Sequence, residues 1–357
     1  TPIAGGVVIC TTKMKKILGY DTDNFVVRVQ PGVLLNDLAE DALKQGLLYP
    51  PDPGEKFATL GGNVSTNAGG MRAVKYGATR DYVSAMTVVL PSGEVVHFGS
   101  NVSKTSSGYS LLNLMIGSEG TLGIITELTL KLIPAPKVTV SLIVPYENLD
   151  EAIATVPKFK KNHMNPQALE FFEREILISS EEYLGKAVFP RNVGGTDVGA
   201  YLLVTFDGNT QDEIDAIVEQ AAELVLEAGA MDVLVADTPA KMKDAWAARS
   251  SFLEGIEEQT KLKSCGHAGD GNLHIYTCAN DMELDEFKKQ VDDFMTKIYD
   301  KATEMGGLVS GEHGIGMGKV DYLARSVGET NMKLMEEIKK VFDPNLILNP
   351  GKVCYKL

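Results

Sequence analysis

The chain has few cysteines, no paired cysteine motif and no long hydrophobic run. Its four cysteines lie far apart among 357 residues, at Cys10, Cys265, Cys278 and Cys354. Without a Cys-x-x-Cys pair, the sequence excludes a cysteine-bound iron–sulfur centre or zinc ribbon and offers no disulfide framework. We therefore expect a reducing, cytoplasmic compartment. No apolar stretch approaches the roughly 20 residues that a membrane-spanning helix needs, so no membrane span is expected.

Basic residues are also scarce. The chain has 34 Lys and Arg against 48 Asp and Glu, which gives a net charge of −14. Such an excess of negative charge is repelled by nucleic acids and by anionic membrane surfaces. The length of the chain suits two domains.

The first part of the chain, from Val7 to Pro134, has short apolar runs broken by glycine and proline, which is typical of strands and turns. One amphipathic helix is expected from Leu34 to Gln45, ended by Gly46. Pro136 lies in the linker that follows. The strands expected in this part are Val7–Cys10, Phe25–Gln30, Val83–Leu90, Val95–Phe98 and Ile124–Ile133.

Beyond the linker, strands alternate with long helices, a pattern that predicts a sheet with helices packed on one face. The expected strands are Val138–Val144, Ala200–Phe206, Met231–Ala236 and Leu273–Cys278. The expected helices are Glu147–Phe159, Gln211–Ala228, Ala240–Thr260, Glu283–Met305 and a last one near Asn331–Phe342.

Two loops in the first part are rich in glycine, serine and threonine. They read G-G-N-V-S-T-N-A-G-G from Gly61 to Gly70 and G-S-E-G-T-L-G from Gly117 to Gly123. Glycine lets backbone amides approach an anion or a polar ring edge, because no Cβ blocks the approach. Neither loop matches the G-x-G-x-x-G dinucleotide motif or the G-x-x-x-x-G-K-[ST] phosphate loop. A single loop of this kind usually forms a turn only, but two in one domain favour a bound cofactor.

Three of the five histidines lie in two short glycine-flanked segments, H-A-G-D-G-N-L-H at 267–274 and G-E-H-G at 311–314. The imidazoles of His267 and His274 and the carboxylate of Glu312 form an N,N,O ligand set with open positions, as a catalytic divalent metal requires. His313 could transfer protons near neutral pH. The two glycines within 267–274 disfavour a helix, so we expect a loop that leads into a short strand.

Other polar residues have plainer interpretations. His97 and His163 lack any such setting and are interpreted as structural. Asp270 and Asn272 are expected to brace the loop or orient the metal ligands. Glu119 is either catalytic or hydrogen-bonded to neighbouring backbone amides.

A series of longer motifs runs along nearly the whole chain. They are P-P-D-P at 50–53, G-G-N-V-S-T-N-A-G-G at 61–70, Y-G-A-T-R-D-Y-V at 76–83, G-S-E-G-T-L-G-I-I-T-E at 117–127, H-A-G-D-G-N-L-H at 267–274, G-E-H-G-I-G at 311–316 and N-P-G-K at 349–352. In this order they resemble the FAD-linked oxidases of the vanillyl-alcohol oxidase type, in the branch of D-lactate, glycolate and D-2-hydroxyglutarate dehydrogenases. Within that branch the chain most resembles the lactate dehydrogenase subunits of anaerobic bacteria that work with an electron-transferring flavoprotein.

The resemblance implies an α+β fold with a vanillyl-alcohol-oxidase-type FAD-binding domain at 1–136. A cap domain with a ferredoxin-like sheet follows at 137–318, and a C-terminal helical segment at 319–357 returns to the flavin. FAD is expected to be non-covalent. The residues implied to contact it are Pro51, Thr59, Gly61, Gly62, Asn63, Ser65, Thr66, Gly69, Gly70, Gly117, Gly120, Gly123, Ile125 and Asn349.

The resemblance also implies roles in catalysis. One divalent metal, zinc, iron(II) or manganese, would be held by His267, His274 and Glu312, with His313 beside the substrate. Arg249, in the W-A-A-R run, would hold the substrate carboxylate, a role that suits a planar guanidinium.

The implied reaction is oxidation of a small D-2-hydroxy acid, first of all D-lactate, with hydride transfer to flavin N5. Electrons would pass to a two-subunit electron-transferring flavoprotein, as in electron bifurcation. A quinone-linked glycolate or D-2-hydroxyglutarate dehydrogenase, a metal-dependent hydrolase and a non-catalytic FAD subunit stay open as alternatives.

Two departures from the family pattern stand out. The family's first pyrophosphate-binding loop is expected before Thr1, so the N-terminal part of the FAD-binding domain is missing from this sequence. The family also carries several dozen more residues between Arg249 and His267 than this sequence does. Either this sequence skips a segment of the complete protein or the substrate pocket is reduced, and the intact flanking motifs favour a skipped segment.

Overall fold

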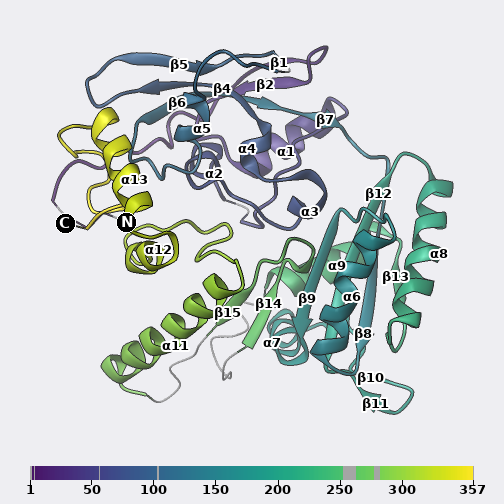
Figure 1. Cartoon of the computed structure of the whole chain (residues 1–357). Coiled ribbons are helices and arrows are strands. Elements are labelled where there is room, and N and C mark those ends of the chain that lie inside the picture. The colour runs from purple at the N-terminus through teal and green to yellow at the C-terminus, as the bar shows by residue number, and fades with distance from the viewer. Residues whose placement is uncertain are drawn as a thin grey trace. The chain divides into compact units, whose positions relative to one another are not determined.

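The computed structural model describes residues 2–3, 5–55, 57–102, 104–251, 263–276 and 282–356, and the chain divides into two compact units (Figure 1). The first unit comprises Thr1–Gly70, Gly77–Ala135 and Asp292–Leu357, and the second comprises Met71–Tyr76 and Pro136–Val291. These units do not coincide with the three expected segments. Residues 292–318, expected in the cap, group with the first unit, and Met71–Tyr76 groups with the second.

The described residues of the first unit form a five-stranded antiparallel sheet in the order β1-β2-β6-β4-β5. Its strands are β1 (Ile17–Asp21), β2 (Val26–Val29), β6 (Ile124–Lys131), β4 (Val83–Val89) and β5 (Val95–Gly99). A separate two-stranded antiparallel sheet pairs β3 (Leu47–Leu48) with β7 (Ile133–Pro134). Strand side chains such as Val27 and Leu128 are fully buried.

The strand expected at Val7–Cys10 is wrong: residues 7–10 belong to no strand and Val7 is 93% exposed. An apolar run becomes a buried strand only where it finds a partner strand and a core to cover it. The edge strand β1 was missed instead, because Gly19 and its mixed polar sequence give no clear alternation.

The helices of the first unit are short, apart from α1 and those near the C-terminus. They are α1 (Leu35–Lys44), α2 (Leu60–Thr66), α4 (Thr79–Tyr82), α5 (Leu111–Met115), α12 (Val320–Val327) and α13 (Glu329–Phe342). The α1 prediction is confirmed, since Leu35, Leu38 and Ala42 follow helical spacing and are buried. The boundary between the units at residues 291 and 292 falls within α11 (Leu284–Glu304).

The described residues of the second unit form a six-stranded sheet in the order β13-β8-β12-β9-β14-β15, with every neighbouring pair antiparallel. Its strands are β13 (Leu234–Ala236), β8 (Val138–Tyr146), β12 (Ala200–Gly208), β9 (Ala168–Glu173), β14 (Lys263–Gly266) and β15 (His274–Tyr276). The helices are α3 (Ala73–Tyr76), α6 (Leu149–Lys161), α7 (Arg174–Leu184), α8 (Gln211–Glu227) and α9 (Pro239–Ser250), and β10 (Asn192–Val193) pairs with β11 (Thr196–Asp197).

Helices cover both faces of this sheet, so the expectation of one covered face is wrong. Leu142 and Leu202 pack in a core with residues of α6 and α8. Their neighbours Ile143 and Leu203 point to the opposite face and pack with residues of α7 and α9. The second helical layer was missed because α7 begins without a capping residue, although Gly185 ends it in the left-handed conformation.

The segment Met71–Tyr76 joins the second unit through a buried carboxylate. Asp207 at the end of β12 accepts a hydrogen bond from the hydroxyl of Tyr76 at 2.6 Å and forms an ion pair with Lys75. Gln167 donates to the same carboxylate at 2.6 Å. In the part of the chain that the structure describes, no helix combines the length and apolar character needed to cross a membrane.

Candidate active site

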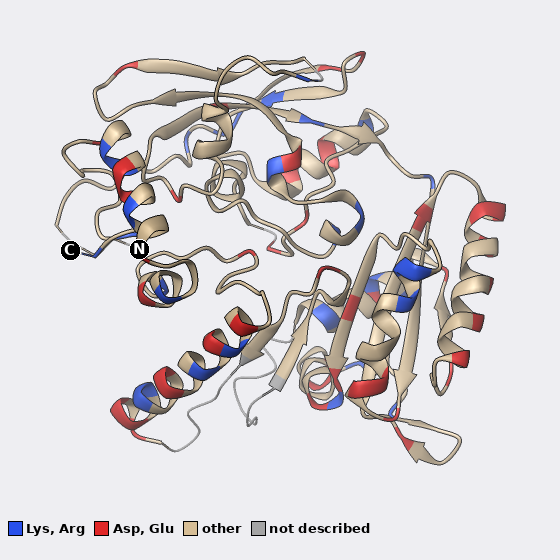
Figure 2. Cartoon of the chain, in the orientation of Figure 1, with Lys and Arg blue, Asp and Glu red and all other residues tan. Residues whose placement is uncertain are grey.

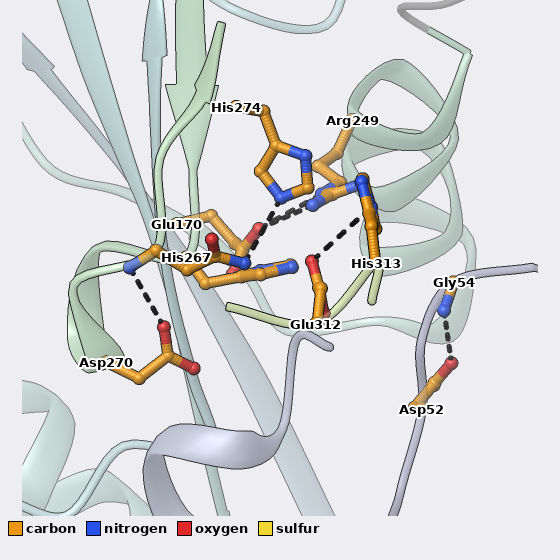
Figure 3. Close-up of polar contacts among 10 residues, drawn as sticks. Asp52, Gly54, Glu170, Arg249, His267, Asp270, His274, Glu312 and His313 are labelled. Carbon is orange, nitrogen blue, oxygen red and sulfur yellow. Dashed lines mark hydrogen bonds and ion pairs between the residues drawn. The ribbon is translucent and has the colours of Figure 1, made fainter. Parts of the chain in front are cut away.

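Two side chains of the second unit, those of Arg249 and His267, meet at one buried carboxylate, that of Glu170 in the middle of β9 (Figure 3). Its Oε2 accepts hydrogen bonds from Nε and Nη2 of Arg249 at 3.0 and 2.9 Å. Its Oε1 lies 2.7 Å from Nδ1 of His267. The side chain of Glu170 has no exposed surface, and those of Arg249 and His267 are 9% and 6% exposed. Sequence reasoning selected Arg249 and His267 and missed the residue that joins them.

A tight turn brings the second histidine next to the first. The segment after His267 forms a short 3₁₀ turn at Ala268–Asp270, and Gly271 follows with φ at 77°. The chain then enters β15 at His274, whose ring centroid lies 5.2 Å from that of His267. This is the expected loop leading into a short strand; the expected end of that strand, residues 277–278, lies outside the described residues.

Both polar residues of the turn help to shape it. Asp270 accepts a hydrogen bond from the amide of Asn272 at 3.3 Å, and the side-chain nitrogen of Asn272 lies 3.5 Å from Nε2 of His274. Gly266 is required just before the turn, since a Cβ there would lie 2.2 Å from the carbonyl oxygen of Asn272.

In the first unit, the G-E-H-G segment presents Glu312 and His313 beside each other. Nε2 of His313 lies 3.9 Å from Oε1 of Glu312, and the side chains are 67% and 10% exposed. Gly69, at the end of the first glycine-rich segment, leaves room for this carboxylate: a Cβ at Gly69 would lie 3.2 Å from Oε2 of Glu312. The exposed imidazole of His313 is suited to exchanging a proton with a ligand or with water.

Glu119 holds the backbone that follows His313. Its two carboxylate oxygens accept hydrogen bonds from the amides of Ile315 and Gly316 at 2.6 and 2.8 Å. Its own carbonyl accepts from the side chain of Asn349 at 2.7 Å. Of the two interpretations left open for Glu119, the structure therefore supports the bond to backbone amides, although these amides lie nearly two hundred residues away in the sequence.

Comparison with known proteins identifies the family. A family model described as the FAD linked oxidases, C-terminal domain, matches residues 135–264 and 256–353, and one described as the FAD binding domain matches residues 1–99. Together these matches cover well over half of the chain. The chain belongs to the FAD-linked oxidases.

Relatives of this FAD-linked oxidase include D-lactate dehydrogenase of Anaerostipes hadrus, which is 66% identical over 99% of this chain and 81% of that protein. Glycolate oxidase subunit GlcD of Bacillus subtilis is 36% identical over 99% of this chain and 81% of its own length. Among solved structures, 4-ethylphenol oxidase from Gulosibacter chungangensis superposes with a TM-score of 0.72 at 17% identity, covering 96% of this chain and 79% of that protein. The resemblance and the α+β fold read from the motifs are confirmed.

The comparison also bears on the short linker between Arg249 and the turn at residues 267–274, which we call the histidine turn. The match to the Anaerostipes protein extends over 386 residues, whereas this sequence has 357, so the relative has residues that this sequence does not contain. The C-terminal family model matches in two stretches that meet at residues 256–264, between Arg249 and His267. The second observation agrees with the prediction that family residues are missing from this sequence between Arg249 and His267.

The residues expected to contact FAD form three groups in the first unit. Gly61, Gly62, Asn63, Ser65 and Thr66 lie in α2, which is a helix and not the irregular loop that was expected. The helix forms because Thr59 caps it, accepting a hydrogen bond from the amide of Gly62 at 3.2 Å. The other groups are the start of β6 with the loop before it, at Gly117, Gly120, Gly123 and Ile125, and the loop residues Pro51, Gly69, Gly70 and Asn349.

Several of these glycines are needed for packing of the protein against itself. A Cβ at Gly61, Gly70 or Gly123 would lie 2.5 Å or less from Pro31, Asp52 or Val88. A requirement for glycine at these places is therefore no sign of a ligand.

Asn63 gives a more direct sign that a polar ligand belongs here. Its side chain is 5% exposed, and its amide nitrogen has no hydrogen-bond partner among the described residues. A buried donor without an acceptor is costly, and the carbonyl and phosphate oxygens of FAD are acceptors. The residues of α2 thus fit a FAD-linked oxidase.

Proposed function

We propose that this FAD-linked oxidase is a dehydrogenase of a small D-2-hydroxy acid, with D-lactate as its substrate. The observation that carries the proposal is the pairing of Arg249 and His267 on one buried carboxylate, in a chain 66% identical to a protein named D-lactate dehydrogenase. A carboxylate-binding cation and a metal-binding imidazole side by side match the two functional groups that a 2-hydroxy acid presents on adjacent carbons.

Arg249 is assigned to the substrate carboxylate. Its guanidinium has five N–H donors, and Nε and Nη2 each donate a hydrogen bond to Oε2 of Glu170. Glu170 thereby fixes the plane of the guanidinium, and a fixed plane is what a two-point hydrogen bond to a second carboxylate requires.

His267 and His274 are assigned to a divalent metal, zinc, iron(II) or manganese. Nδ1 of His267 is assigned as the donor to Glu170, and in that neutral tautomer Nε2 carries the lone pair that a metal ligand needs. Glu312, which belongs to the first unit, is proposed as the third ligand. A metal bound there would supply Lewis-acid chemistry that lowers the pKa of the substrate hydroxyl.

His313 is assigned as the general base that takes the hydroxyl proton of the substrate. FAD, held by α2 and the 117–125 segment, would supply the chemistry of hydride acceptance at its N5. The first glycine-rich segment contributes the side-chain amide of Asn63. Asn349 lies beside Gly120, in the middle of the second segment, since a Cβ at Gly120 would lie 2.8 Å from Nδ2 of Asn349.

The test is anaerobic mixing of the flavin-loaded protein with D-lactate, L-lactate, glycolate and D-2-hydroxyglutarate, with bleaching of the flavin absorption as the readout. D-Lactate is expected to reduce the flavin fastest. The variant His313→Asn should slow reduction by a factor of about 10²–10⁴, the usual contribution of general-base catalysis. Faster reduction by glycolate or D-2-hydroxyglutarate would reject lactate as the substrate, and no reduction by any of the four would reject the dehydrogenase.

FAD is proposed to be non-covalent, because no histidine lies in the loops assigned to it. Acid precipitation should then release the yellow chromophore into the supernatant. Colour that stays with the pellet would contradict this.

For the electron acceptor we propose an electron-transferring flavoprotein. The spacing of the cysteines and the absence of a dinucleotide motif leave the chain without an obvious second redox centre of its own. The second unit also offers a polar surface: α8 carries six exposed acidic residues and no basic one (Figure 2). Such a surface favours a transient, charge-steered contact. Lactate-dependent reduction of NAD only when a purified electron-transferring flavoprotein is added would support this acceptor, and rapid unaided transfer to a quinone would reject it.

The remaining alternatives are less well supported. A metal-dependent hydrolase does not account for the FAD-binding segment, and a non-catalytic FAD subunit does not account for an arginine and a histidine bound to the same buried carboxylate. The cysteine content keeps the cytoplasm as the proposed compartment.

A further inference from the structure

Glu170 is an unusual residue for its position. It lies at the centre of β9 between the buried residues Leu169 and Phe171, and its own side chain is fully buried. A carboxylate in such a place is strongly unfavourable unless both of its oxygens are paired. Apolar residues would fill the position without that cost, so the carboxylate has a task other than packing.

The two oxygens of Glu170 serve different partners. Oε2 accepts hydrogen bonds from Arg249 in α9, and Oε1 contacts Nδ1 of His267 at the start of the histidine turn. Figure 3 shows the three side chains converging from three elements of the second unit. The orientation of the imidazole and that of the guanidinium therefore depend on one rigid group.

We infer that Glu170 is a positioning residue that fixes the Nδ1–H tautomer of His267 and the plane of Arg249 together, and so couples metal binding to binding of the substrate carboxylate. The metal and substrate assignments rest on the proposed function. The tautomer does not, because it follows from the contact between Glu170 and His267 alone.

Replacement by glutamine keeps the volume of the side chain but removes the negative charge and changes the hydrogen-bonding pattern. Glutamine has the shape of glutamate but offers one oxygen and one NH₂ group. If the NH₂ faces His267, Nδ1 must accept, the ring proton moves to Nε2, and the lone pair needed by a metal is lost. If the NH₂ faces Arg249, two donors oppose each other and the guanidinium loses its anchor. Because the guanidinium can only donate and a neutral imidazole can also accept, the amide oxygen should face Arg249, so His267 is the partner that is released.

Glu181 provides a matched control in the same unit. Its carboxylate is also buried, and it accepts hydrogen bonds from the amides of Val188 and Phe189 at 2.6 and 2.7 Å. The variant Glu181→Gln should disturb the fold to a similar degree without touching the histidine turn. Glu170→Asp, which keeps the charge but is one methylene shorter, is a second test variant should the glutamine variant fail to fold.

The first measurement uses the full chain without metal. Five histidines make ¹⁵N-histidine labelling readable, with His267 assigned from a His267→Ala sample. The wild-type protein and Glu181→Gln are expected to show a hydrogen-bonded Nδ1–H signal for His267, which shifts or disappears in Glu170→Gln and Glu170→Asp. A neutral Nε2–H tautomer of His267 in the wild type, or an unchanged signal in both Glu170 variants, would overturn the inference.

The second measurement is the affinity for Zn²⁺, by competition with a chromogenic chelator. Loss of a residue that hydrogen-bonds to a metal-binding histidine typically weakens metal affinity by about 10–100-fold. We expect this weaker zinc binding and a raised KM for D-lactate in Glu170→Gln but not in Glu181→Gln. Zinc binding by the wild type with less than a threefold change in Glu170→Gln would overturn the coupling while leaving the proposed function intact. A wild type that binds no zinc would overturn the proposed metal site and the coupling with it.

Discussion

Glu119→Gln should loosen the segment that carries Glu312 and His313. The carboxylate of Glu119 accepts two hydrogen bonds, from the amides of Ile315 and Gly316, and hydrogen bonds to a charged group contribute about 1.5–3 kcal/mol each. Glutamine keeps one acceptor and places an NH₂ group against the other amide. The segment should then lose one bond, or about 2 kcal/mol of local stability.

Amide hydrogen exchange measures this loss directly, since it reports local opening and does not require that both units unfold together. About 2 kcal/mol corresponds to exchange roughly 30-fold faster, because about 1.4 kcal/mol is a factor of ten. Mass spectrometry of a peptide covering residues 311–317 is the assay. Turnover of D-lactate should fall together with protection, because the same backbone orients His313.

The matched control is Glu127→Gln in the same unit. Glu127 pairs with Arg28 at 2.9 Å on the surface, and exposed pairs of this kind contribute about 0–1 kcal/mol. Protection of residues 311–317 should be unchanged in this variant. Exchange less than threefold faster in Glu119→Gln would refute the reasoning, because the carboxylate would then not be holding the segment.

Three further predictions follow from other residues. Arg249→Lys should raise the KM for D-lactate more than it lowers kcat, because one ammonium cannot reproduce the planar fork held by Glu170; steady-state kinetics showing the reverse split would reject the role. Iodoacetamide at pH 8 should label Cys10 well before Cys265, as read by mass spectrometry. Cys10 is exposed and its pKa is lowered by hydrogen bonds to Thr12, whereas burial raises the pKa of Cys265 to about 12. Burial by itself raises the pKa of Asp343, but hydrogen bonds from Lys339 and nearby amides lower it overall. The stabilising effect of Asp343 is therefore complete above the ordinary pKa of 3.8 and is lost as the pH falls through the lower folded pKa. The difference in melting temperature between the wild type and Asp343→Asn should shrink from pH 7 to pH 3, and a constant difference would contradict the ion pair with Lys339.

Local patterns predicted the parts of this fold that repeat a signal over many residues. The helices α1 and α8 each show apolar residues at helical spacing, and α8 begins at a capping box formed by Thr210 and Glu213. Strand β9 was missed because its sequence A-L-E-F-F-E places a charge where a buried strand normally has an apolar residue. That charge is Glu170, so the residue that hid the strand is the one that joins the site.

The candidate site was predictable only as a set of unconnected motifs. The contact between Glu170 and His267 spans 97 residues, and that between Glu119 and Ile315 spans 196. No periodicity or spacing encodes such pairings, since they depend on how the sheet and loops come together. Likewise, the sequence marks Gly61 and Gly123 as unusual, but only the neighbouring atoms distinguish close packing from contact with a ligand.

The division of the chain into units has a consequence for how it folds. The second unit is built almost entirely from one continuous stretch, Pro136–Val291, whereas the first needs residues on both sides of that stretch. Contacts such as the one from Lys339 to the carbonyl of Thr121 close a loop of more than two hundred residues, and long loops slow the formation of the contacts that close them. During synthesis the second unit can therefore complete its sheet while the first still waits for α12 and α13. The Glu312–His313 segment, which Glu119 must capture across that loop, is thus expected to be among the last parts of the enzyme to reach its final conformation.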